Sequence, residues 1–167
     1  VFQDVYLFED TIENNIKFGK QNASHEEVVE AAKKARCHEF IEALPEGYDT
    51  IIGEGGASLS GGEKQRISIA RAMLKDADII IFDEATANID PENEDKLKEA
   101  IESLTKNKTV IMIAHRLKTI RNADQILVLK DGEIVERGNH EELIENNGLY
   151  SDLINAKAKA ESWKLNN

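Results

Sequence analysis

Residues 59–90 constrain the fold more than any other stretch, because they join a helix that starts with two glycines to a strand that ends in two acids. They read LSGGEKQRISIARAMLKDADIIIFDEATANID. Residues 63–75 are helix formers with apolar side chains at roughly helical spacing. Gly61 and Gly62 let a ligand approach the backbone closely, and the start of a helix offers free N–H groups and a partial positive charge. This part of the stretch therefore predicts a phosphate-binding site.

The second part of the stretch is an apolar run, Ile79–Phe82, followed by Asp83 and Glu84. Short runs rich in β-branched residues are typical of buried parallel strands. The carboxyl ends of such strands are where open α/β sheets bind ligands. Adjacent strand residues point to opposite sides, so we expect different tasks for the two acids. One can hold a metal while the other handles the proton of a water molecule.

These motifs resemble those of ATP-binding-cassette (ABC) ATPases. LSGGEKQ is similar to their signature motif and IIIFDE to their Walker B strand, in the order and at the spacing of the family. The resemblance implies an α/β fold, namely a partial P-loop NTPase (ABC ATPase) fold with a mostly parallel sheet flanked by helices. We expect a helical and signature subdomain over about 11–75, a core with Walker B, D-loop and H-loop over 76–140, and C-terminal helices over 141–167.

The resemblance also implies roles for single residues. Glu84, His115 and Gln3 would be catalytic, with Glu84 polarising the attacking water. Asp83 would hold Mg²⁺, aided by Gln3. The implied nucleotide-binding residues are Ser60, Gly61, Gly62, Glu63 and Asp90. Glu63 departs from the glutamine that is common in the signature motif, so its contact stays open.

Without the resemblance, several of these residues have simpler interpretations. Gln3 is a polar loop residue, and a histidine after a strand, such as His115, is usually structural. Asp90 fits the N-cap of a helix that begins with Pro91. The apolar run 109–114 is expected to be another buried parallel strand. The position of His115 directly after it, at the sheet edge expected for Asp83 and Glu84, favours a functional role.

The function implied by the resemblance is the ATP-hydrolysing motor of an ABC exporter. Two such domains would enclose two MgATP molecules head to tail, and each domain would contact a transmembrane domain at the cytoplasmic face of a membrane. The alternatives are a non-transport ABC ATPase of the DNA-repair or chromosome-maintenance type and a catalytically silent regulatory domain.

Composition narrows the class of protein. The formal net charge of −11 argues against a nucleic-acid partner, which usually requires a basic face. No window approaches the 18 or so apolar residues of a membrane span, and no signal-peptide pattern is present. The single cysteine, Cys37, excludes an internal disulfide and is expected to be a buried structural thiol in a reducing compartment.

No G-x-x-x-x-G-K-[ST] phosphate loop occurs in the 167 residues. We therefore expect a fragment that lacks the Walker A strand and is inactive in isolation. In the family that strand lies between the strand before His115 and the strand beginning at Gln125. Its loss would leave two strand edges unpaired, so we expect rearrangement, pairing with another chain, or displacement of the final hairpin.

Further elements follow from local signals. Ser24 and Glu27 fit a capping box before a helix, and a second helix is expected over 38–44. Residues 50–56 are expected to be a mobile loop, either a plain connector or the exporter loop that senses the opposite half of the transporter. The pair Asp131-Gly132 predicts a hairpin.

Two expectations concern the ends of the chain. His140 is expected to begin terminal helices that are broken at 147–148. The apolar residues Phe8, Ile12 and Ile16 form either core or a surface for a partner, and the resemblance favours the coupling helix of a transmembrane domain.

Overall fold

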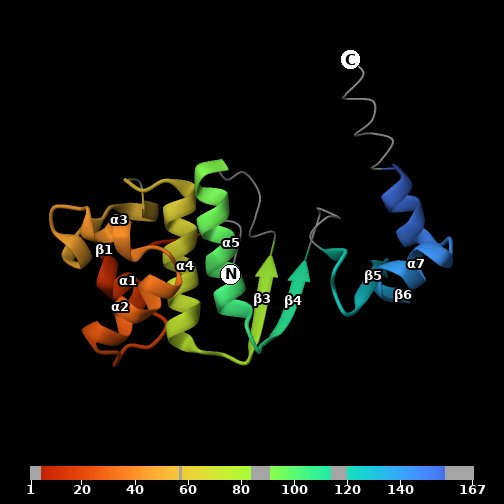
Figure 1. Cartoon of the computed structure of the whole chain (residues 1–167), viewed down its shortest axis with the longest axis horizontal. Coiled ribbons are helices and arrows are strands. Elements are labelled where there is room, and N and C mark those ends of the chain that lie inside the picture. Colours follow the sequence, from red (N-terminus) through yellow and green to blue (C-terminus); the bar gives the residue numbers. More distant parts are fainter. Residues whose placement is uncertain (1–4, 57, 84–90, 114–119, 157–167) are drawn as a thin grey trace, which may run out of the picture. The chain divides into compact units, whose positions relative to one another are not determined.

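The computed structural model describes residues 5–56, 58–83, 91–113 and 120–156, with the backbone alone at 54 and 91–94. The chain divides into two compact units, Val1–Ile113 and Ala114–Asn167. Each unit is described separately below (Figure 1).

The first unit is built around one long helix. Its elements, in chain order, are β1 (Asp10–Thr11), α1 (Ile12–Lys17), α2 (His25–Lys34), α3 (His38–Glu42), the 3₁₀ turn η1 (Gly47–Asp49), β2 (Ile51–Ile52), the 3₁₀ turn η2 (Glu54–Gly56), α4 (Gly61–Lys75), β3 (Ile79–Asp83), α5 (Pro91–Thr105) and β4 (Thr109–Ile113). Helix α4 contacts α1, α2 and α5. It lies between the short helices and α5 (Figure 1).

Local sequence signals set the starts of the helices. The predicted capping box at Ser24 and Glu27 is confirmed, since each residue's side chain accepts a hydrogen bond from the other's backbone N–H. Helix α1 has Thr11 as its N-cap, with the hydroxyl accepting from Asn14 N. Helix α5 begins at Pro91, as predicted.

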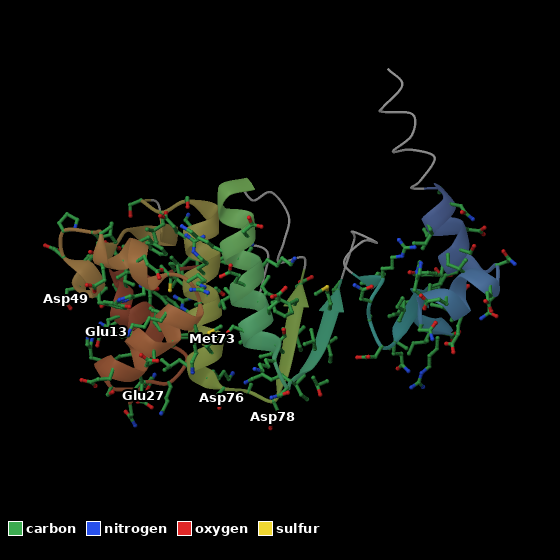
Figure 2. The ribbon with its side chains drawn as sticks, in the orientation of Figure 1. Glu13, Glu27, Asp49, Met73, Asp76 and Asp78 are labelled. Carbon is green, nitrogen blue, oxygen red and sulfur yellow. The ribbon has the colours of Figure 1, made fainter. Side chains whose placement is uncertain are left out.

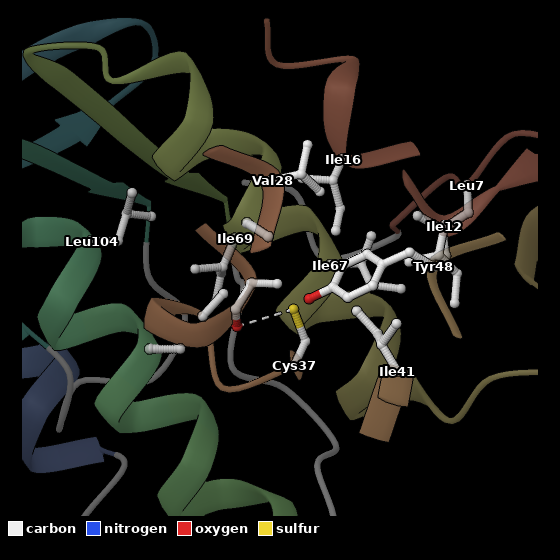
Figure 3. Packing of buried hydrophobic residues seen from close by; sticks show 14 of the residues in the cluster. Leu7, Ile12, Ile16, Val28, Cys37, Ile41, Tyr48, Ile67, Ile69 and Leu104 are labelled. Carbon is white, nitrogen blue, oxygen red and sulfur yellow. Dashed lines mark hydrogen bonds between the residues drawn. The ribbon is translucent and has the colours of Figure 1, made fainter. Parts of the chain in front are cut away.

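The core of this unit forms where the apolar faces of these helices meet the inner face of β3 (Figure 3). α5 contributes Leu97, Ala100 and Leu104, which are buried. Cys37 is fully buried, as predicted, and its thiol donates to the Ala32 carbonyl at 3.4 Å. Burial raises the pKa of this thiol to about 12, so the side chain is protonated and unreactive at neutral pH.

The strands of the first unit form two small ladders. β3 and β4 are parallel, as predicted, with Ile79 opposite Thr109 and Asp83 opposite Ile113. β1 pairs antiparallel with β2. This second ladder corrects the expectation of a mobile loop over 50–56, since Ile51 and Ile52 are β-branched residues with a partner strand at Asp10–Thr11.

The prediction that the parallel strands are buried is wrong in large part. In β3 only Ile80 and Phe82 face the core, while Ile79 and Ile81 are exposed. All five residues of β4 are exposed. The reason is that, among the described residues, β4 has one neighbouring strand and no helix packs closely on its faces.

The second unit is a hairpin packed against a helix. β5 (Ile126–Lys130) and β6 (Glu133–Gly138) are antiparallel and are joined by the predicted turn at Asp131 and Gly132, both at positive φ. α7 (His140–Glu145) follows, and a helical segment over 149–156 begins after Gly148. The core of this unit consists of Ile126, Val128, Leu143 and Tyr150.

The described strands thus form one parallel and two antiparallel pairs rather than one mostly parallel sheet. The expected closure of a gap by rearrangement, partner chain or displaced hairpin stays a prediction. The helical insert expected before α4 is present as α1, α2 and α3.

Candidate functional site

The start of α4 carries the residues predicted to bind phosphate. Ser60 is the N-cap, and its hydroxyl oxygen accepts from Glu63 N at 3.3 Å. The carboxylate of Glu63 accepts from Ser60 N at 2.8 Å. The two residues form a capping box, which the pattern S-x-x-E at residues 60–63 signals in the sequence.

The environment of Gly61 separates a binding role from a packing role. Apart from its chain neighbours and the nearby backbone of its own helix, a Cβ at this position would have no heavy atom within 4 Å. Gly61 lies in the first turn of a regular helix, where alanine is normally the more favourable residue. No neighbouring atom in the described chain would clash with a side chain here, so packing does not explain the glycine. The glycine instead leaves space for a group that approaches from outside.

Asp83 lies at the carboxyl end of β3, the strand that follows α4 in the chain. It is the last residue of β3, is partly exposed, and sits level with Ile113, the last residue of the parallel neighbour β4. In Figure 1, α4 and β3 run in opposite directions, so the beginning of α4 and the carboxyl ends of both strands point the same way. The structure thereby brings the predicted phosphate end and the predicted metal ligand to one side of the unit.

The remaining predicted site residues lie outside the described residues. These are Gln3, Glu84, Asp90 and His115. Glu84 directly follows Asp83, and His115 is two positions beyond Ile113. Gly62, which the structure does describe, is buried in the first turn of α4.

The donor set offers partial support for a magnesium ion. Among the described residues, no group of three or more histidine, cysteine or acidic side chains is arranged to hold a metal ion. A single accessible carboxylate at Asp83 still fits Mg²⁺, which keeps most of its water ligands and is usually held by one or two carboxylates plus substrate phosphates. Asp83 is therefore the described residue that would hold it.

Sequence reasoning also missed a half-buried cation, Arg71, near the other end of α4. Arg71 donates to the carbonyl oxygens of Tyr6 and Asn15 and to the amide oxygen of Asn15. The signal in the sequence is its spacing of four from Ile67, which places an arginine on a buried helix face. The nearby apolar residues were expected to form either core or a surface for a partner. Ile12 and Ile16 are fully buried and belong to the core, whereas Phe8 is exposed.

Comparison with known proteins connects this site to transport ATPases. A protein-family model described as "ABC transporter" matches residues 1–87. The chain is 58% identical over 153 residues to an ATP-dependent lipid A-core flippase of Syntrophus aciditrophicus (strain SB). It is 53% identical over 156 residues to a beta-(1-->2)glucan export ATP-binding/permease protein of Brucella melitensis biotype 1.

These relatives are much longer than the present chain. The matches cover 92% and 93% of this chain but 26% of each relative. The structure is similar to that of a bacterial Atm1-family ABC exporter with ATP bound, with a TM-score of 0.82 and 46% identity over 93% of this chain and 27% of that one. Both relatives and the solved structure are exporters or flippases by name.

No helix within the described part of the chain is long and apolar enough to cross a bilayer. The family model covers more than half of the 167 residues and includes the signature and Walker B motifs recognised in the sequence. This chain therefore belongs to the ABC transporter family, as part of an ATP-binding domain of the exporter type.

Proposed function

We propose that this chain is the ATP-binding and ATP-hydrolysing motor portion of an ABC exporter, which couples hydrolysis of MgATP to transport of a substrate across a membrane. The observation that supports it most is the start of α4, where a capped helix end and a glycine with open space around it form a surface suited to phosphate. The exporter names of its relatives favour transport over DNA repair or a silent regulatory role.

In this proposal two copies of the domain, or two related domains, close head to tail over two nucleotides. Ser60, Gly61 and Gly62 contact the γ-phosphate held by the opposite domain, and Glu63 and Asp90 lie beside it at the domain interface. Catalysis then depends on positioning and on stabilisation of charge, because the protein forms no covalent bond to the phosphate.

The other side of each nucleotide is held by the strand ends. Asp83 holds Mg²⁺, with help from Gln3, and the ion when bound neutralises charge that develops on the phosphates. Glu84 polarises the attacking water, while Gln3 and His115 position that water and the γ-phosphate.

We propose the transmembrane portion of the same transporter as the second partner, at the cytoplasmic face of the membrane. Its docking surface on this chain is the aromatic surface, defined as the exposed rings of Tyr6, Phe8 and Phe18. The rings contact one another: Tyr6 and Phe8 meet edge to face with centroids 5.4 Å apart, and Phe8 and Phe18 are tilted by 44° with centroids 4.9 Å apart. Exposed Glu9 and Asp10 follow Phe8, so we expect the docking segment to be apolar with basic residues at its margin.

Substitution of Glu84 tests the catalytic assignment. In the full-length transporter, Glu84→Gln is expected to preserve ATP binding and to stall hydrolysis. Glu102→Gln, a change at an exposed acid of α5, is the control and should leave turnover unchanged. Unchanged turnover in the Glu84 variant would remove this residue from the role of base.

We further propose that residues 1–167 alone have no appreciable ATPase activity and bind nucleotide weakly, because these residues include no phosphate-loop motif. A calorimetric titration of the isolated chain checks this. Micromolar affinity for MgATP would contradict the proposal.

A further inference from the structure

The guanidinium of Arg71 lies beneath the aromatic surface and hydrogen-bonds to the segment that carries it. Nη1 donates to the Tyr6 carbonyl at 2.7 Å, Nε to the Asn15 carbonyl at 2.5 Å and Nη2 to the Asn15 amide oxygen at 2.5 Å. The guanidinium carbon also lies 5.5 Å from the centre of the Phe8 ring and 5.7 Å from that of Phe18. One side chain of α4 thus contacts all three residues of the surface.

Asn15 extends this network along the chain. Its buried side-chain amide donates to the carbonyls of Phe8 and Thr11, at 3.1 and 2.9 Å, and its oxygen accepts from Phe8 N at 2.9 Å. The backbone over residues 8–11 is therefore fixed to Asn15, and Arg71 fixes Asn15 to α4. Buried polar groups in such a network are costly to leave unpaired, so its members move together.

Two further observations concern the charge of Arg71 and the packing of the chain beside Phe18 against α4. The acceptors of Arg71 are two carbonyls and an amide, all neutral, and burial lowers its pKa to about 10, so it remains charged at neutral pH. The chain next to Phe18 packs directly on the backbone of α4, since a Cβ at Gly19 would lie 2.2 Å from the Arg71 carbonyl oxygen. The backbone beside Phe18 is therefore in direct contact with α4.

The same helix leads to the nucleotide end. Ser60, the N-cap of α4, lies about 16 Å from Arg71 along the helix axis at 1.5 Å per residue. α4 is one regular helix from Gly61 to Lys75, so a continuous ladder of backbone hydrogen bonds joins Arg71 to the turn that follows Ser60.

We propose that Arg71 is a positioning residue that transmits docking at the aromatic surface to the phosphate-binding start of α4. The inference rests on the proposed function and names the side chain through which the transmembrane portion would influence the composite nucleotide site. Arg71 touches neither nucleotide nor water in this account, and its effect on turnover passes through α4.

The test is a double-substitution cycle on ATP turnover in the full-length transporter in lipid nanodiscs. Phe18→Ala removes an exposed ring, Arg71→Lys keeps the cation but not the planar three-donor fork, and the third variant combines both changes. Lys75→Gln, one turn further along α4 at an exposed position, is the matched control and should leave kcat unchanged.

We expect Phe18→Ala and Arg71→Lys each to lower kcat at least fivefold while KM for ATP stays within twofold. In the Arg71→Lys background, Phe18→Ala should change kcat by less than 1.5-fold, because docking is no longer transmitted. Arg71→Met provides a second background for the same comparison. A full, multiplicative effect of Phe18→Ala in both backgrounds, or a wild-type kcat in Arg71→Lys, would overturn the inference.

The outcome also separates this inference from the proposed function. A wild-type protein that hydrolyses ATP and is stalled by Glu84→Gln, with multiplicative Phe18 and Arg71 effects, retains the function and loses the role of Arg71. A wild-type protein without ATP hydrolysis would overturn both.

Discussion

Helices α2 and α4 begin with the same device but serve different ends. In each, a serine N-cap accepts from the glutamate three residues on at 3.3 Å, and that glutamate accepts from the serine N–H at 2.8 Å. After Ser24 the first turn of α2 continues with His25 and Glu26, whereas after Ser60 that of α4 continues with two glycines. The cap therefore has the same structural part in both helices, and in our proposal the start of α4 differs because Ser60 and the two glycines after it contact phosphate.

The largest effect that would sharpen this comparison is expected at Gly61. Gly61→Ala should lower the kcat of ATP hydrolysis in the full-length transporter at least tenfold, because a methyl group then occupies the space left for phosphate. Thermal unfolding of the chain should shift by less than about 2 °C, since a Cβ there meets no other atom. Glu26→Ala, at an exposed first-turn position of α2, is the control and should leave turnover unchanged.

The contradicting outcome is an unfolding temperature that falls several degrees with Gly61→Ala while turnover is retained. The glycine would then be a structural requirement of α4.

The two serines should separate stability from activity. Ser24→Ala and Ser60→Ala each remove a side-chain cap, so each is expected to lower the free energy of unfolding by about 1 kcal/mol, measured by urea denaturation. Only Ser60→Ala should also lower turnover, by roughly fivefold or about 1 kcal/mol in activation free energy. Equal losses of turnover in both variants would break the comparison, because the effect would then follow from stability alone.

A smaller effect is expected at the paired glutamates. Gln keeps an oxygen that can accept from the N-cap N–H, so Glu63→Gln should leave the capping box in place while removing a negative charge from the proposed phosphate surface. We therefore expect the ATP-dependent dimerisation of the complete nucleotide-binding domain carrying Glu84→Gln to strengthen about twofold to fivefold when Glu63→Gln is added. Analytical sedimentation of the two variants measures this dimerisation. Glu27→Gln is the matched control, and the same strengthening there would contradict this assignment.

The smallest effect concerns pH at α2. Hydrogen bonds from Lys20 and from the Ser24 N–H hold the pKa of Glu27 below its usual value of 4.5. A carboxyl with a lowered folded pKa stabilises the fold above that usual value, and this contribution is lost as the pH falls through the folded pKa. The difference in unfolding free energy between wild type and Glu27→Gln should therefore shrink as the pH falls from 6 to 3. Glu27 is labelled among the acidic side chains of the first unit in Figure 2. A difference in unfolding free energy that stays constant with pH would contradict the account.

Much of the first unit was predictable because its signals are local. The capping box at Ser24, the helix start at Pro91, the apolar face of α4 and the parallel pairing of β3 with β4 all follow from patterns within a few residues or from strand composition. The turn at Asp131-Gly132 belongs to the same class. The caps, the helix face and the turn are specified by neighbours in the sequence, whereas the pairing of β3 with β4 joins residues thirty positions apart and was predicted from strand composition and the family resemblance.

Features that depend on distant partners were not predictable in the same way. The burial expected for β4 is wrong because burial depends on neighbouring strands and helices, not on the β-branched run itself. The pairing of Ile51–Ile52 with Asp10–Thr11 joins residues about forty positions apart, and the bonds of Arg71 span more than fifty. At the candidate site, the sequence predicted roles for Ser60, Gly61 and Asp83, while the open space at Gly61 required coordinates.

The central claim is that the start of α4 faces a nucleotide while the identical cap of α2 does not. Amide hydrogen exchange of the full-length Glu84→Gln transporter, with and without MgATP, tests it most directly. The account predicts that exchange over residues 60–64 slows when MgATP binds and that exchange over 24–28 is unchanged. Bound MgATP with equal exchange at 60–64, or equal slowing at both caps, would contradict it.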